Sequence, residues 1–389
     1  MQNPAIVMFM GATGLGIVRS LGRLDIPVFG LDSDKNAVGF YSKYCSEKIV
    51  AVDPSIDSEK CLEQLMAFGE KLNTKAVLFP ASDHYVSFVS RYRKELSTYF
   101  LFNIPDKKIL DQIVDKTSQY ELAKKFNIPI AKTYSPKNYE ELKIYYNDLK
   151  FPLFVKGRSS YDWVSKFNIK GFLVNNVNEL DDVIKRAFQH NVLPLIQEII
   201  VGPNKNHYKV NAYYSKNKEL KCLFSTQKTR QYPIDFGVGS YNSSVYNEEL
   251  IMLAKRFFEG IEYTGVGSME FKLDERDKVF KLIEINPRYW QQNIQATCAG
   301  VNIPLTNYSE CIGKDISTQD KFLNDVCWID FVQDFRSFMK NRKRGDIHFI
   351  DWIKSLKNVN CHSYYSNDDI RPAFHHFKNI VIKIKNQVS

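Results

Sequence analysis

Residues 270–288 read EFKLDERDKVFKLIEINPR, and this stretch decides the fold. Its alternation of apolar and polar residues predicts a β-hairpin, with strands over 267–272 and 279–286. Side chains alternate faces along a strand, so Glu284, Asn286 and Arg288 point the same way. Glu270, on the neighbouring strand, shares that face. The hairpin therefore gathers two carboxylates, an amide and a guanidinium.

This polar face has the composition of a metal site. The carboxylates of Glu270 and Glu284 and the amide oxygen of Asn286 are hard oxygen ligands. Such ligands suit Mg²⁺, which prefers octahedral oxygen sites completed by phosphates and water. Acids on a strand face are often only solvated, but Pro287 and Arg288 directly after this set favour the metal interpretation. We expect Mg²⁺ here, with Mn²⁺ as the alternative ion.

Length and composition describe an ordinary globular protein. A chain of 389 residues suits two or three packed units, and 44% hydrophobic with 25% charged residues excludes a disordered chain. No apolar run approaches the roughly 20 residues that a membrane span needs. The first residues, Met1-Gln2-Asn3-Pro4, lack the basic region of a secretory signal. We expect a cytoplasmic protein without a membrane span.

Cysteine usage and charge add few constraints. The seven cysteines are scattered and never form a C-x-x-C pair, so their spacing indicates neither a disulfide framework nor a zinc site. The net charge of +9 is spread widely, apart from one basic cluster over residues 340–344. That cluster is either a solvated loop or a patch for an anionic partner. No nucleic-acid partner is expected.

The first hundred residues have the rhythm of a parallel α/β domain. Apolar runs at 5–10, 27–32 and 76–80 alternate with helical patterns at 17–24 and 61–72, which predicts a doubly wound sheet. Glycines at Gly11, Gly14 and Gly16 follow the first strand. They invite a dinucleotide interpretation, but the spacing is not G-x-G-x-x-G. The alternatives are a structural role for this turn or a contact with an acceptor substrate.

After about residue 106 the predicted secondary structure changes from alternating strands and helices to short strands with a few helices. Helices are predicted over 107–114, 116–126 and 248–259, with short strands between them, including 153–156, 194–198, 208–214 and 220–225. Antiparallel strands flanked by a few helices predict an α+β unit. After about Gly313 the pattern becomes helical and basic.

Two lysines and one strand end are candidates for nucleotide binding. Lys156 closes an apolar run before Gly157, and Lys116 opens a helix, so both could reach a phosphate. Each could equally be a plain surface residue. Residues 197–200 end a hydrophobic strand. There Gln197 and Glu198 could contact the polar edge of an adenine, while Ile199 and Ile200 pack against its ring.

The order of these features resembles the ATP-grasp superfamily over about residues 107–313. The resemblance implies a Rossmann-like domain over 1–105, a two-lobed ATP-grasp domain over 106–313 with its lid at about 145–200, and a C-terminal extension over 314–389. It implies that Lys116 and Lys156 contact ATP phosphates and that residues 197–200 form the adenine hinge. Glu270, Glu284 and Asn286 would hold Mg²⁺, and Arg288 would face the transferred phosphoryl group or the substrate carboxylate.

Residues 228–240 resemble a narrower group, the stand-alone carboxylate–amine ligases, to which D-aspartate ligases belong. Lys228 and Arg230 are two apart and share a face if the strand continues, where they would bind an acyl phosphate or an acidic substrate. A solvated strand face is the alternative. The sequence departs from the superfamily after Lys156, where a glycine-rich loop is expected and only Gly157 is present. We assign no role to Lys209.

The resemblance implies an ATP-dependent ligase that joins a small-molecule carboxylate to an amine and releases ADP and phosphate, often as a homodimer. Three alternatives stay open. The first is a bicarbonate-using carboxylase or carbamoyl-phosphate-forming enzyme, and the second is a Rossmann oxidoreductase. The third is a nucleotide-binding protein without turnover.

Overall fold

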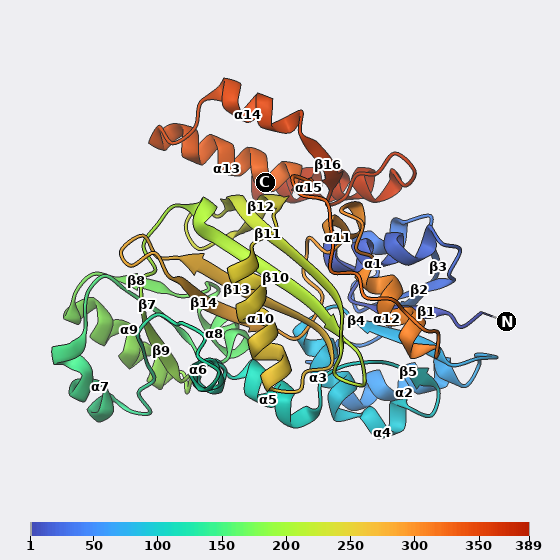
Figure 1. Ribbon diagram of the computed structural model, residues 1–389, viewed down its shortest axis with the longest axis horizontal. Helices are drawn as coiled ribbons and strands as arrows, with labels where there is room; N and C mark the ends of the chain where they lie inside the picture. The colour runs from blue at the N-terminus through green and yellow to red at the C-terminus, as the bar shows by residue number, and fades with distance from the viewer. Residues whose placement is uncertain (1, 389) are drawn as a thin grey trace.

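The computed structural model describes residues 2–388 and contains three sheets (Figure 1). The first sheet has the order β3-β2-β1-β4-β5, and every neighbouring pair is parallel. Its strands are β1 (Ala5–Met8), β2 (Val28–Asp32), β3 (Cys45–Val50), β4 (Ala76–Pro80) and β5 (Phe100–Leu101). Its helices are α1 (Ala12–Gly22), η1 (Val38–Tyr41), α2 (Ser58–Gly69), α3 (Asp83–Arg91) and α4 (Arg93–Leu96). The predicted doubly wound sheet is confirmed.

The glycines after β1 serve close packing. Helix α1 begins at Ala12, so Gly14 and Gly16 lie inside the helix and not in a turn. A Cβ at Gly14 would lie 2.1 Å from the carbonyl oxygen of Phe9, and one at Gly16 would lie 2.5 Å from Oδ1 of Asn293. No side chain fits at Gly14, because the clash is with backbone, and at Gly16 the Asn293 side chain would have to move. This packing supports the structural alternative for the glycines.

The second sheet is small and has the order β6-β9-β7-β8. It comprises β6 (Thr133–Tyr134), β7 (Leu153–Gly157), β8 (Phe172–Val174) and β9 (Pro194–Glu198). The surrounding helices are α5 (Lys107–Val114), α6 (Lys116–Lys125), α7 (Tyr139–Tyr145), η2 (Tyr146–Asp148), α8 (Ser160–Phe167) and α9 (Val177–Gln189). Where the superfamily pattern calls for a glycine-rich loop, this chain has α8. Ser159 caps that helix, and the buried Trp163 side chain fixes it against β7.

The third and largest sheet has the order β14-β13-β10-β11-β12-β15-β16. Its first five strands along the chain are antiparallel: β10 (His207–Tyr214), β11 (Leu220–Tyr232), β12 (Val238–Ser244), β13 (Gly265–Leu273) and β14 (Phe280–Asn286). The helices are η3 (Asn204–Asn206), α10 (Glu248–Gly260), α11 (Ile294–Cys298) and α12 (Ile303–Cys311). Leu250, Phe257 and Phe258 of α10 pack into the core of this sheet. The predicted α+β unit is confirmed.

The C-terminal region contains helices, as its sequence pattern predicts, but it also contains two short strands that the sequence does not predict. It adds β15 (Cys327–Ile329) and β16 (Val359–His362) to the edge of the third sheet, with helices α13 (Phe331–Arg344), α14 (Phe349–Leu356) and α15 (Arg371–Val388). Each strand is too short to show a period of two in the sequence. The region is also tied to the first sheet, because Asp369 accepts hydrogen bonds from Arg19 and Ser42. No helix in the described part of the chain is long and apolar enough to cross a membrane.

Candidate active site

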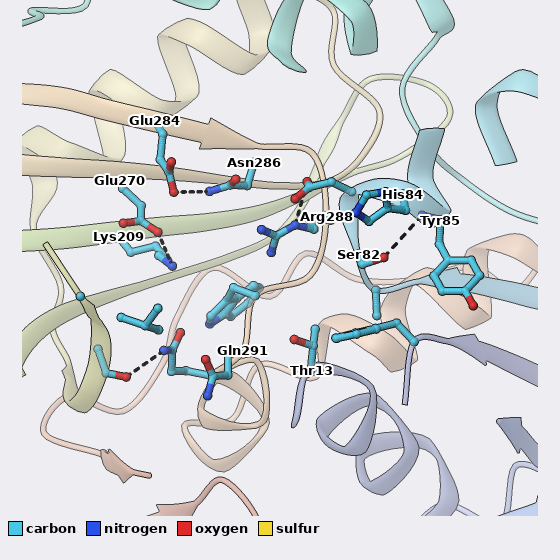
Figure 2. A pocket seen from close by; sticks show the side chains of 18 of the residues that line it. Thr13, Ser82, His84, Tyr85, Lys209, Glu270, Glu284, Asn286, Arg288 and Gln291 are labelled. Carbon is cyan, nitrogen blue, oxygen red and sulfur yellow. Dashed lines mark hydrogen bonds and ion pairs between the residues drawn. The ribbon is translucent and has the colours of Figure 1, made fainter. Parts of the chain in front are cut away.

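A cavity of about 670 Å³ lies between the first and third sheets. Strands β1 and β4 are adjacent, and the chain order reverses there, so their carboxyl ends leave the crevice typical of doubly wound sheets. Phe9 and Asp83, which follow these strands, line the cavity on one side. The hairpin of β13 and β14 lines it on the other (Figure 2).

The four polar residues of the hairpin face this cavity together, namely Glu270, Glu284, Asn286 and Arg288. Glu270 and Glu284 are directly paired across β13 and β14. Nδ2 of Asn286 donates to Oε1 of Glu284 at 3.1 Å (Figure 2). The strand alternation correctly predicts that these side chains share a face; their functional roles stay predictions.

Each carboxylate has its own lysine. Nζ of Lys116 lies 3.2 Å from Glu284, and Nζ of Lys209 lies 2.6 Å from Glu270. Burial raises the pKa of Glu284, but the charge of Lys116 and the Asn286 amide outweigh it and hold this pKa well below its ordinary value. Burial likewise raises the pKa of Glu270, and Lys209 more than offsets this. Both groups are carboxylates at neutral pH.

These residues fit a divalent cation. Two adjacent ionised carboxylates in a cavity repel each other unless positive charge lies between or beside them. Within residues 2–388, no three His, Cys, Asp or Glu side chains gather as a self-sufficient metal site. A cation here would therefore depend on Asn286 and on a ligand such as phosphate or water, which is how Mg²⁺ is commonly bound.

Some of the residues predicted to bind the nucleotide form a hydrogen-bonded network next to Glu284, on the side away from the cavity. Lys116 opens α6 and contacts Glu284, while Nζ of Lys156 donates to Gln197 Oε1 and Tyr120 Oη, each at 3.0 Å. None of the six residues predicted to bind the nucleotide lines the cavity itself; they are Lys116, Lys156, Gln197, Glu198, Ile199 and Ile200. Glu284 thus stands between this network and the cavity.

The hinge residues are held by backbone pairing. Glu198 ends β9, pairs with Leu153 and donates its backbone N–H to the carbonyl of Lys132 at 2.9 Å. Ile200 is buried, and the carbonyl of Ile199 accepts a hydrogen bond from Arg276. The segment therefore connects the small sheet to the large one through fixed contacts.

The two predicted arginines have different surroundings. Nε of Arg288 lies 2.8 Å from Asp83 of α3, so this guanidinium joins the two sides of the cavity (Figure 2). Arg230 does not share a face with Lys228, and that prediction is wrong. The register of β11 and β12 shifts between the two residues, which turns Arg230 away into a buried pair with Asp334 of α13 at 2.8 Å. Only Lys228 of the two lines the cavity.

Lys228 is an unusual cation. Burial lowers its pKa to about 8, the attraction of Glu270 opposes this, and the repulsion of Lys209 adds to it. Nζ donates to Gln231 Oε1 at 3.2 Å and to the carbonyl of Gly237 at 3.5 Å. No carboxylate contacts Lys228 among the ion pairs of the described residues.

Several cavity residues are missed by the sequence reasoning. Lys209 is the partner of Glu270, and its place opposite Glu270 becomes visible only when β10 is paired with β13. Asp83 and His84 also line the cavity. Their signal is positional, because they open α3 just after the end of β4, and the carboxyl ends of parallel strands are where such sheets bind ligands.

Comparison with known proteins agrees with this geometry. The crystal structure of N5-carboxyaminoimidazole synthetase from Staphylococcus aureus matches with a TM-score of 0.63 at 16% identity, covering 82% of this chain and 80% of that one. The L-amino acid ligase from Bacillus licheniformis matches with a TM-score of 0.60 at 13% identity, covering 80% and 75%. The chain has the ATP-grasp fold, as the order of its motifs predicts.

Within that fold, the sequence is homologous to the D-aspartate ligase of Enterococcus faecium (strain Aus0004). The two are 26% identical over 289 residues, which is 70% of this chain and 67% of the relative. No family model matches the chain. The biotin carboxylase domain of the Hydrogenobacter thermophilus 2-oxoglutarate carboxylase, crystallised with MgADP and bicarbonate, also shares the fold, with a TM-score of 0.66, 16% identity and coverage of 84% and 74%. The chain thus shares its fold with ATP-grasp proteins and is similar in sequence to a ligase.

Proposed function

We propose that this protein is an ATP-dependent carboxylate–amine ligase that forms an amide-type bond and releases ADP and phosphate. The observation that carries the proposal is the pair Glu270–Glu284 with its two lysines, at the boundary between a cavity and the lysine network of Lys116 and Lys156. The homology to D-aspartate ligase supports the choice of an amine as the second substrate.

The proposed chemistry begins with phosphoryl transfer. A substrate carboxylate attacks the γ-phosphorus of ATP, the bond to the β-phosphate oxygen breaks, and an acyl phosphate and ADP form. Lys116 and Lys156 would hold the phosphates, since positioning and charge neutralisation dominate this reaction. Glu270, Glu284 and Asn286 would hold Mg²⁺, which supplies further positive charge to the phosphates.

An amine then attacks the acyl carbon and loses a proton to solvent, and phosphate leaves with the electron pair of the broken C–O bond. Arg288 lies at the junction of both cavity walls and would stabilise the oxyanion that forms. Lys228 would bind the acyl phosphate. The segment that follows α8 reaches the cavity at Lys170 and would exclude water from this reactive intermediate.

The test is ADP release by the purified protein with Mg-ATP across pools of carboxylic acids and amines. Release that requires one member of each class supports the proposal, and deconvoluting the pools names the pair. Release that requires only bicarbonate would instead indicate a carboxylase or a carbamoyl-phosphate-forming enzyme. ATP binding without release in any pool would contradict the ligase function. Sedimentation of the same protein tests the expected homodimer.

A further inference from the structure

Helices α13 and α14 form a hairpin at the outside of the molecule (Figure 1). Their inner sides are held by Phe338 and Trp352, which are buried and stack with ring centroids 4.5 Å apart. Their outer sides carry six exposed apolar residues, among them Ile350 at 65% and Phe349 at 50% exposure. The outer apolar residues are Phe331, Phe335, Met339, Phe349, Ile350 and Ile353.

The exposed aromatic rings make up one surface and are not scattered. Phe331, Phe335 and Phe349 all lie within 6.4 Å of the Trp352 ring, measured between centroids. Phe331, Phe335 and Met339 also follow each other at intervals of four along α13, which places them on one stripe. We call this surface the hairpin patch. Contiguous exposed apolar residues of this kind mark interaction sites.

Basic residues adjoin the hairpin patch. Residues 340–357 contain six Lys or Arg and two Asp, and the basic cluster noted in the sequence forms the last turn of α13. In residues 2–388, Arg344 is the one member of this cluster in an ion pair, with Asp235. The exposed Lys340 and Lys343 are thus available to an anionic surface.

Exposed aromatic and aliphatic side chains beside lysine and arginine match the interface of a bilayer with anionic lipids. The apolar side chains enter the boundary between headgroups and acyl chains, and the basic groups meet the negative headgroups. A second copy of the chain fits less well, because a symmetric contact would bring the same positive groups together. We propose that the hairpin patch docks the protein peripherally on an anionic lipid surface.

The experiment is co-sedimentation of the full chain with two kinds of vesicle. One kind is phosphatidylcholine alone, and the other is phosphatidylcholine and phosphatidylglycerol in equal parts. We expect binding to the anionic vesicles that weakens as salt is raised, and little binding to the neutral ones. Failure to bind anionic vesicles at low salt would overturn the proposal.

Paired variants locate the contact. Lys340→Glu/Lys343→Glu and Phe335→Ser/Ile350→Ser should each weaken binding by about tenfold or more. The matched controls Lys60→Glu/Lys94→Glu and Ile56→Ser change exposed residues in the region of the first sheet, away from the hairpin patch. They should bind vesicles as the wild type does. Equal losses in variants and controls contradict the proposal, as does lipid-free self-association that the patch variants abolish. The lysine variants alter only exposed side chains, so the test survives if the apolar double variant fails to fold.

Discussion

Glu270 and Glu284 lie directly opposite each other on β13 and β14, and each is paired with a different lysine from a different part of the chain. Lys209 comes from the neighbouring strand β10, while Lys116 comes from the start of α6. The arrangement keeps two half-buried carboxylates ionised side by side. It also connects the cavity with the lysine network expected to hold ATP.

Glu284→Gln should lower ADP formation by about 10²-fold or more, because the variant removes a proposed cation ligand and the counter-charge of Lys116. The measurement is the rate of ADP release with the substrates that the pools identify. Glu262→Gln, which removes an exposed carboxylate paired with Lys218, is the matched control and should keep wild-type activity. Near-wild-type turnover in Glu284→Gln would remove this residue from the site.

Arg230→Met should lower the stability of the protein more than Arg288→Met does. Arg230 is buried with Asp334, so its loss leaves an unpaired buried charge and should cost about 3 kcal/mol of unfolding free energy. Arg288 is partly exposed, as is its partner Asp83, so its loss should cost less than about 1 kcal/mol.

The effect on activity should be the reverse: Arg288→Met should lose far more activity than Arg230→Met. The folded Arg230→Met protein should retain its kcat within about twofold, whereas Arg288→Met should lose about 10²-fold if the guanidinium stabilises the oxyanion. Chemical denaturation and steady-state kinetics on the same preparations make the comparison. A large loss of stability with full activity in Arg288→Met would reverse these assignments.

Lys228→Met should stabilise the protein at neutral pH. The pKa of Lys228 is lowered to about 8, so between pH 8 and its ordinary value of 10.5 the unfolded chain binds more protons than the folded chain. The cost of this lysine is therefore fully present below pH 8 and disappears as the pH rises toward 10.5. The gain should be about 3 kcal/mol at pH 7.

Denaturation of wild type and Lys228→Met across pH 7 to 11 gives the comparison, and the difference should shrink over that range. Lys314→Met, at an exposed position, is the control and should show no such dependence. A constant difference at every pH would mean that packing, and not the charge, sets the stability of the variant.

Asp369→Asn should loosen the attachment of the C-terminal region. Asp369 is fully buried, accepts hydrogen bonds from Arg19, Ser42 and the backbone of Lys43, and neutralises the buried Arg19. The substitution should cost about 3 kcal/mol in chemical denaturation. Asp368→Asn beside it breaks an exposed pair with Arg23 and should cost less than about 1 kcal/mol. Equal costs would show that burial does not set the strength of this contact.

The sequence predicts the parts of the fold that have a strong local period. Strands β1, β2 and β4 of the first sheet, the helices α5, α6 and α10, and the hairpin of β13 and β14 follow from alternation and apolar spacing. The edge strands β3 and β5 of the first sheet are not predicted. The short strands β15 and β16 cannot be predicted in this way, because they form only through pairing with a neighbour: β15 pairs with β12, and β16 pairs with β15. α8 is missed because a resemblance to other proteins suggested a loop where a serine cap and a buried tryptophan favour a helix.

The same distinction applies to the site. Glu270, Glu284, Asn286 and Arg288 reach one cavity because the period of two along β14 and its pairing with β13 are local properties. Lys228 and Arg230 are separated by a register shift, which no spacing rule reveals. Lys209 requires knowledge of which strands are neighbours, and Asp83 requires knowledge of how two sheets face each other.

The most direct test of the central claim follows the oxygen atoms of the carboxylate. The acid identified by the pools is labelled with ¹⁸O in its carboxyl group and allowed to react with the amine and Mg-ATP, and the released phosphate is analysed by mass spectrometry. Activation as an acyl phosphate predicts that one ¹⁸O atom is transferred to each phosphate formed. Phosphate without the label, released while product accumulates, would contradict the proposed mechanism.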